Sequence, residues 1–296
     1  MKMKNQFSVF TFHFSVFSFQ LSVFTFFHYL CRMKHLKILL LLLVVLPMAC
    51  GCGRKSRSKG VEVVEPVRYT YRIAATYPHS REAYTQGLQY ADGLLWEGTG
   101  EYGGSTLKTT DLTTGKEEIL IELPNSEFGE GITLLGDKIY QLTWNENTCH
   151  VYDRTTRRKL RDFRYAGEGW GLTTDGEKLY FSNGTSTLSR LDPETFRREA
   201  SVVVTLRGVP VEYLNELEWI DGKIWANIYL SDQIAIIDPQ SGVIEGIINL
   251  EGILPATEQE LTTDVLNGIA YDEAQKRIFI TGKKWPHIYQ IELIKQ

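Results

Sequence analysis

The chain has 296 residues, of which 43% are hydrophobic and 12% aromatic, and its net charge is −4. This length suffices for one large domain with a full core, and the mild charge without a basic stripe argues against nucleic acid as a partner. After Cys52 only Cys149 remains, so no disulfide framework is expected in the folded part. His79, His150 and His287 are scattered without metal-ligand spacing, and we expect neither a zinc site nor any other cofactor.

The first 32 residues are dominated by Phe and Ser, and Phe-Ser-Val-Phe occurs at residues 7–10 and again at 14–17. We interpret residues 1–32 as upstream sequence translated from a misplaced start, with Met33 as the true start, and exclude them from the fold.

Residues 33–52 have the pattern of a secretory signal, whose apolar segment at 38–46 is too short to span a bilayer comfortably. The small residues before Cys50 and Cys52 resemble a bacterial lipoprotein processing site, and either cysteine could carry the lipid. A plain signal with two incidental cysteines is the alternative. Residues 53–67 are predicted to form a polar linker. We therefore expect a protein of the bacterial cell envelope that faces the periplasm and meets the membrane only through its lipid anchor.

A weak internal repeat runs through residues 68–296. Each unit opens with a short apolar pair, continues into an Asp-Gly type of turn, and then enters an apolar and aromatic strand; the openings recur every 40 to 52 residues. The openings are Gly87-Leu88, Gly131-Ile132, Gly171-Leu172, Glu216-Leu217 and Gly268-Ile269. Four short antiparallel strands at this period are typical of a propeller blade. The sequence therefore predicts an all-β fold, a five-bladed β-propeller.

The fifth unit ends after its third strand, at residues 289–294, and needs a fourth strand from elsewhere. Residues 68–76 alternate aromatic and polar side chains and precede the first unit. We expect this N-terminal strand to complete the last blade and close the ring, because closure removes exposed strand edges.

The first strand of each propeller blade lines the central channel, so equivalent positions just before the five openings should meet at one mouth. These positions hold Gln86, Glu130, Trp170, Asn215 and Asn267. The sequence thus predicts a small pocket with one carboxylate, several amides and an aromatic wall, which is the usual form of a ligand site.

Three further side chains fall near the same mouth because they follow the second strands of their units. Trp144, Tyr229 and Lys283 are the candidates, with packing between blades or a solvated loop as the alternative reading. The other tryptophans are assigned to packing between blades. A single acid among amide donors suits acid–base chemistry at an amide or ester. The sequence contains no Gly-X-Ser-X-Gly motif, which disfavours a serine nucleophile.

Seven motifs in order resemble the plant-type glutaminyl-peptide cyclotransferases, also called glutamine cyclotransferases, over residues 69–293. They are Tyr84-Thr85-Gln86-Gly87-Leu88, Phe128-Gly129-Glu130-Gly131-Ile132, Tyr140-Gln141-Leu142-Thr143-Trp144, the run from Gly169 to Gly176, Leu214-Asn215-Glu216-Leu217-Glu218, Trp225-Ala226-Asn227-Ile228 and Thr281-Gly282-Lys283-Lys284-Trp285-Pro286.

The resemblance implies a five-bladed propeller that converts the N-terminal glutamine of peptides or proteins to pyroglutamate and releases ammonia without a metal. It places the catalytic acid at Glu130. The substrate pocket matches Gln86, Trp144, Trp170, Asn215 and Lys283, and Tyr229 stands where the plant enzyme has a tryptophan. A monomer is expected.

Two other functions remain open from the residues alone. A non-catalytic envelope propeller could serve as a lipid-tethered binding scaffold, since fold does not settle function. A metal-dependent propeller hydrolase would need several inward acids, and the rim offers only Glu216 beside Glu130.

Overall fold

The structure, a computed structural model, describes residues 64–296. Residues 1–32 and 33–52, the two candidate lipidation sites Cys50 and Cys52, and residues 53–63 of the predicted linker all lie outside the described residues. Within the described part of the chain, no helix is long and apolar enough to cross a bilayer.

The described chain is built of β-strands joined by tight turns, and the prediction of an all-β fold is confirmed. The Asp-Gly pairs form the turns expected of them: Asp92 and Gly93 have φ values of 55° and 79°, and Asp221 and Gly222 have 48° and 80°. Two successive positive φ values match the right-handed twist of a hairpin. A short 3-10 helix, η1 (Ala256–Glu258), is the one helical element in the described range.

Three groups of four consecutive strands each form an antiparallel sheet. The first contains β2 (Thr85–Ala91), β3 (Leu94–Thr99), β4 (Thr106–Thr110) and β5 (Glu117–Glu122). The second contains β6 (Gly129–Leu135), β7 (Lys138–Thr143), β8 (Thr148–Asp153) and β9 (Lys159–Arg164). The third contains β10 (Leu172–Thr174), β11 (Leu179–Phe181), β12 (Thr187–Leu191) and β13 (Arg198–Val203). A small hairpin, β14 (Thr205–Leu206) with β15 (Val209–Pro210), follows the third sheet.

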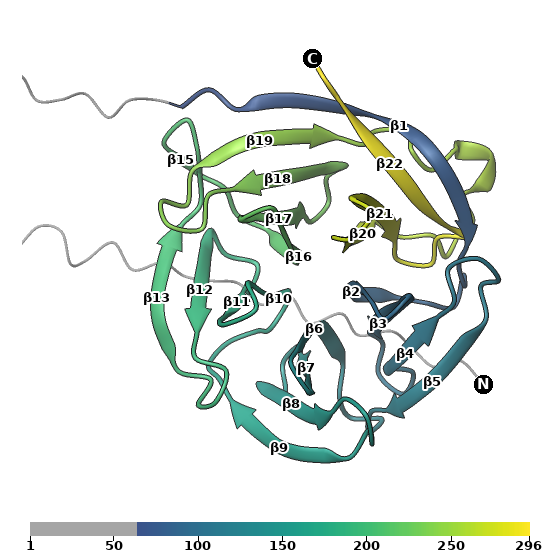
Figure 1. The fold of residues 1–296 in the computed structure, drawn as a ribbon, viewed down its shortest axis with the longest axis vertical. Helices are drawn as coiled ribbons and strands as arrows, with labels where there is room; N and C mark the ends of the chain where they lie inside the picture. Colours follow the sequence, from purple (N-terminus) through teal and green to yellow (C-terminus); the bar gives the residue numbers. More distant parts are fainter. Residues whose placement is uncertain (1–63) are drawn as a thin grey trace, which may run out of the picture. The chain divides into compact units, whose positions relative to one another are not determined.

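The remaining strands form one eight-stranded sheet, which the sequence did not predict. It contains β16 (Leu214–Ile220), β17 (Lys223–Ile228), β18 (Gln233–Ile237), β19 (Ile244–Asn249), β20 (Leu266–Asp272), β21 (Arg277–Gly282), β22 (His287–Lys295) and β1 (Val67–Pro78). As expected, β1 pairs antiparallel with β22, and so provides the fourth strand that the last repeat lacks. Its N-terminal end also pairs in parallel with β19, through Val67 and Gly246 (Figure 1). This pairing joins a fourth group of strands, β16 to β19, to a fifth group, β20 to β22 with β1.

The first strand of each group lies nearest the common centre in Figure 1, and the last strand lies outermost. The inner strands touch in a closed cycle, β2 to β6 to β10 to β16 to β20 and back to β2. Glycines permit this close approach. The backbone N–H of Gly131 donates to the carbonyl of Trp170 at 2.7 Å, and a Cβ added at Gly171 would lie 2.0 Å from the carbonyl oxygen of Asn215.

Apolar side chains fill the spaces between neighbouring groups. Tyr180 of the third group stacks on Trp219 of the fourth with ring centroids 5.2 Å apart. Phe279 of the fifth group is fully buried against Leu88 and Tyr90 of the first. These contacts hold the inner strands in register, so the positions that open each repeat reach the same end of the ring.

Candidate active site

A cavity of about 260 Å³ opens at the entry ends of the inner strands. Each lining side chain lies on or just before a first strand, or just after a second strand. These two ends meet in an antiparallel hairpin, which explains why residues far apart in sequence converge. The lining residues are Tyr84, Gln86, Phe128, Glu130, Trp144, Trp170, Asn215, Tyr229 and Lys283. Seven of the eight pocket residues predicted from the sequence are among these nine.

Glu130 is the carboxylate of the cavity and is 4% exposed, on β6 between two glycines. Gln86 donates from Nε2 to its Oε1 at 3.0 Å. Burial raises the pKa of Glu130 well above 4.5; the charge of Lys283 opposes the rise, and the carboxylates of Glu168 and Glu146 add to it. A carboxyl whose pKa is raised by burial binds a proton more readily, so it can both accept a proton and return it during catalysis.

Gln86 is held with its amide nitrogen toward Glu130. The amide Nδ2 of Asn267 donates to Gln86 Oε1 at 3.2 Å and to the carbonyl of Thr85 at 3.0 Å. Because the oxygen of Gln86 is engaged by Asn267, its nitrogen faces the acid. Asn267 was predicted to line the pocket, and this was wrong: it lies behind Gln86 and orients it.

Lys283 brings a cation into the same space. Its Nζ lies 4.6 Å from the ring centroid of Tyr84 and 5.3 Å from that of Tyr229. Such contacts stabilise a buried ammonium. Burial nevertheless lowers the pKa of Lys283, although the charges of Glu130 and Asp264 act in the opposite direction. The amine can therefore lose its proton at a lower pH than an ordinary lysine.

Asn215 presents an unused acceptor. Its side-chain Oδ1 is buried and has no hydrogen-bond partner, whereas its backbone carbonyl accepts from Ser182 Oγ at 2.7 Å. A buried amide oxygen without a partner is costly, and this cost is recovered when a ligand N–H occupies the cavity.

Aromatic rings form the walls. Phe128 and Trp144 meet edge to face at 5.6 Å, and Trp170 and Tyr229 do so at 5.6 Å. Tyr84 turns its hydroxyl away from the cavity, donating to Asp264 Oδ2 at 2.9 Å. The walls are therefore largely aromatic, while Gln86 and Lys283 interact with the acid.

Glu216 does not enter this cavity, contrary to the rim position that the sequence suggested. Its buried carboxylate accepts from the backbone N–H groups of Leu88 at 3.2 Å and Ile269 at 2.9 Å. Glu216 stands at the position that glycine occupies in the other repeats, and its two hydrogen bonds link β16 to β2 and β20. Burial raises its pKa well above 4.5, and the neighbouring Glu218 adds to the rise.

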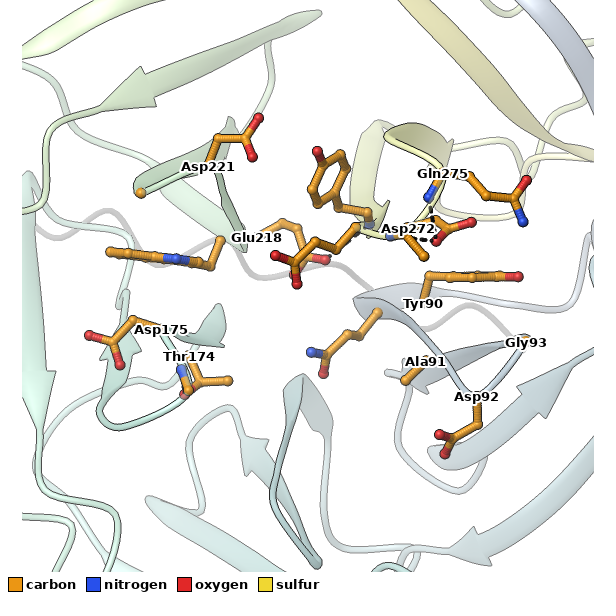
Figure 2. A pocket seen from close by; sticks show the side chains of 17 residues that line it. Tyr90, Ala91, Asp92, Gly93, Thr174, Asp175, Glu218, Asp221, Asp272 and Gln275 are labelled. Atoms are coloured by element: carbon orange, nitrogen blue, oxygen red, sulfur yellow. Dashed lines mark hydrogen bonds between the residues drawn. The ribbon is translucent and has the colours of Figure 1, made fainter.

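A larger cavity of about 640 Å³ lies at the opposite ends of the inner strands, among the hairpin turns (Figure 2). Three of its acids, on three different hairpins, already have side-chain partners. Asp92 pairs with Arg154, Asp221 with Lys276, and Asp175 accepts from a tyrosine hydroxyl. We therefore place the candidate active site at the smaller cavity, where an acid, a cation and an unpaired acceptor converge. No group of three or more His, Cys, Asp or Glu residues arranged to hold a metal occurs among residues 64–296.

The predicted set missed four residues around the pocket. Tyr84 and Phe128 line it and lie two residues before Gln86 and Glu130, so they were present in the quoted motifs without a role. Glu168 accepts hydrogen bonds from two pocket tryptophans, and Asp264 holds Tyr84. No pattern in the sequence marks these two acids, because each acts through a loop conformation.

In this all-β ring, a pocket whose one carboxylate lies among amide and lysine side chains belongs to the class of sites that transfer protons on a small polar group. Comparison with known proteins narrows this class. The family model of the glutamine cyclotransferases matches residues 42–293, and the chain belongs to this family. A glutaminyl-peptide cyclotransferase of Arabidopsis thaliana is 46% identical over 227 residues, covering 75% of this chain and 70% of the plant protein. The crystal structure of Myxococcus xanthus glutaminyl cyclase matches with a TM-score of 0.71 and 36% identity, covering 78% of this chain and all of that one.

Proposed function

We propose that the chain converts N-terminal glutamine of peptides or proteins to pyroglutamate and releases ammonia, with the cavity around Glu130 as the active site. The observation that carries this proposal is the convergence of a buried acid, a buried lysine and an unpaired amide oxygen inside aromatic walls. The proposal agrees with the family and with the activity of the 46% identical plant relative.

The reaction is intramolecular, so much of the rate comes from holding the glutamine folded. The α-amine must meet the γ-carboxamide carbon at about 3–3.5 Å, and such orientation supplies about 7–11 kcal/mol of the barrier. Trp144, Trp170 and Phe128 enclose the methylene groups of the side chain, and the cavity of about 260 Å³ suits a group of this size. Asn215 Oδ1 accepts an N–H from the substrate, which gives its buried oxygen a partner.

Glu130 carries the proton. As the α-nitrogen forms its bond to the carboxamide carbon, Glu130 takes a proton from the amine and gives it to the departing nitrogen, whose bond to that carbon breaks to release ammonia. One acid serves both steps because its pKa is raised by burial. The Nε2 of Gln86 fixes one carboxylate oxygen, which leaves the other for the substrate.

Lys283 faces the charge that develops on the carbonyl oxygen. A protonated amine in a buried pocket stabilises an oxyanion more than it stabilises the neutral carbonyl of the ground state. Its position over two tyrosine rings keeps the cation in place before substrate binds.

The test is an ammonia-release assay on the domain from Val61 onward, with a Gln-initiated dipeptide, in the presence and absence of a chelator. We expect equal turnover in both conditions, and pyroglutamate as the second product. Turnover that the chelator abolishes would point to a metal-dependent hydrolase, and no turnover with intact fold would point to a binding scaffold.

We further infer that the closed cycle of inner strands is a five-bladed propeller, in which β20, β21, β22 and β1 form the last blade. A crystal structure of the domain tests this number directly. We also propose that the protein is exported and tethered through Cys50 or Cys52, faces the periplasm and acts as a monomer. The supporting observation is the signal-like pattern of residues 33–52. Lipid labelling of single Cys→Ser variants and light scattering of the domain test these points.

A further inference from the structure

Glu168 lies in the loop between β9 and β10, two residues before Trp170. A single carboxylate oxygen, Oε2, accepts two hydrogen bonds from indoles. The Nε1 of Trp144 donates to it at 2.8 Å, and the Nε1 of Trp170 donates to it at 2.8 Å. The two tryptophans come from different strand groups, so one side chain ties together two walls of the cavity.

An indole N–H that is shielded from water needs an acceptor, and a carboxylate is the strongest one a protein offers. Trp144 also packs edge to face on Phe128, and Trp170 on Tyr229. The orientation of both indoles therefore fixes most of the apolar wall. Without the shared acceptor, each ring keeps its packing contact but loses the hydrogen bond that fixes its orientation.

We propose that Glu168 is a positioning residue of the active site, which locks Trp144 and Trp170 in the orientation that folds the substrate glutamine for ring closure. The proposal rests on the active site assigned above. It adds a residue that does not touch the reacting atoms and acts through the two indoles.

Glu168 also places a negative charge near Glu130. Burial is the main cause of the raised pKa of Glu130, Glu168 and Glu146 raise it further, and Lys283 lowers it. Removing the charge of Glu168 therefore shifts the titration of Glu130 to lower pH. A role confined to the stability of the loop would leave that titration unchanged.

Three changes separate these effects. Glu168→Gln keeps an oxygen that can accept from the indoles and removes the charge, whereas Glu168→Ala removes both. Glu177→Gln serves as the matched control, because Glu177 is an exposed acid on the hairpin at the far end of β10.

The first readout is the set of six tryptophan indole N–H signals in a ¹H–¹⁵N NMR spectrum, since the chain has six Trp residues. In Glu168→Ala we expect two signals, identified by Trp144→Phe and Trp170→Phe, to move upfield and lose protection from hydrogen exchange. Glu168→Gln is expected to leave them near their wild-type positions. This readout does not depend on turnover, so it tests the positioning even where cyclisation is not detected.

The second readout is cyclisation of a Gln-initiated dipeptide. We expect kcat/KM to fall about 10- to 100-fold in Glu168→Ala, the scale of loss seen when a reacting group is displaced by about 1 Å. We expect a smaller loss in Glu168→Gln and none in Glu177→Gln. Unchanged indole signals in Glu168→Ala, or kcat/KM within twofold of wild type, would overturn the proposal. If Glu168→Ala does not fold, unchanged Glu130 titration and kinetics in Glu168→Gln would overturn the charge effect. Trp144 and Trp170 indole N–H signals of the wild type that show no protection from hydrogen exchange would then overturn the positioning.

Discussion

Replacing Glu130 with glutamine changes activity and stability in opposite directions. The side chain keeps its shape, and its amide oxygen can still accept from Gln86, but it can no longer take up a proton. General acid–base catalysis contributes about 10²- to 10⁴-fold, and we expect a loss of at least this size in kcat. The fold should become more stable near neutral pH, because glutamine requires neither a buried charge nor the uptake of a proton on folding.

The size of the gain follows from linkage. The folded-state pKa of Glu130 is raised well above 4.5 by burial, so between these two pKa values the folded protein holds a proton that the unfolded chain has lost. Stability of the wild type therefore falls as pH rises from 4.5 through the raised pKa. Each tenfold preference for the protonated form in the folded state corresponds to about 1.4 kcal/mol. For a domain of this size, that is a rise in Tm of about 3–6 °C in the glutamine variant.

Scanning calorimetry of wild type and Glu130→Gln at pH 4 and pH 7, with the dipeptide assay alongside, measures both effects. We expect the gain in Tm to be large at pH 7 and small at pH 4, where the wild-type acid is protonated. Glu118→Gln, at an exposed position on β5, is the control and should change neither quantity. A Glu130→Gln variant with wild-type turnover, or one less stable than wild type at pH 7, would refute the reasoning.

Three further outcomes are expected. Gly171→Ala should lower stability by about 1–3 kcal/mol in chemical unfolding and weaken turnover, because the new Cβ would meet the carbonyl of Asn215 at 2.0 Å, whereas Gly104→Ala, which meets nothing within 4 Å, should be neutral. Lys283→Met should reduce kcat about 10²- to 10³-fold. Because the pKa of Lys283 is lowered, wild-type kcat should fall as pH rises through that lowered value, and Lys283→Arg, which keeps its charge, should lose that alkaline decline in a pH–rate profile. Asn267→Ala should cost about tenfold in kcat/KM by releasing the amide of Gln86, and about 1–3 kcal/mol of stability because the buried carbonyl of Thr85 loses a donor; kcat/KM within twofold of wild type would contradict its orienting role.

Much of the fold was predictable because local chemistry sets it. Asp-Gly pairs such as Asp92-Gly93 specify tight turns, and an apolar strand follows each of them. The repeat of these turns placed Glu130 and Asn215 at equivalent positions, so their convergence followed from the period. The parallel pairing of Val67 with Gly246 was not predictable, since nothing in either strand distinguishes a shared edge from a solvated one.

The residues that orient the site were less accessible from sequence. Asn267 occupies an equivalent repeat position, yet it turns behind Gln86 because its amide finds the Thr85 carbonyl there. Glu216 stands where the other repeats have glycine, and backbone N–H groups from two neighbouring strands hold its carboxylate. Glu168 depends on the path of a loop. In each case a hydrogen bond formed only in the assembled ring decides the role.

The proposed reaction depends most on a buried carboxyl, Glu130, whose pKa lies well above the usual range of an acid. Titration of ¹³C-labelled glutamate side chains by NMR measures this directly, with the Glu130 signal identified by its absence in Glu130→Gln. We predict that the Glu130 carboxyl of the free enzyme titrates well above 4.5 and that turnover requires it. A Glu130 signal that titrates at or below 4.5 would contradict the assignment of this residue as the proton carrier.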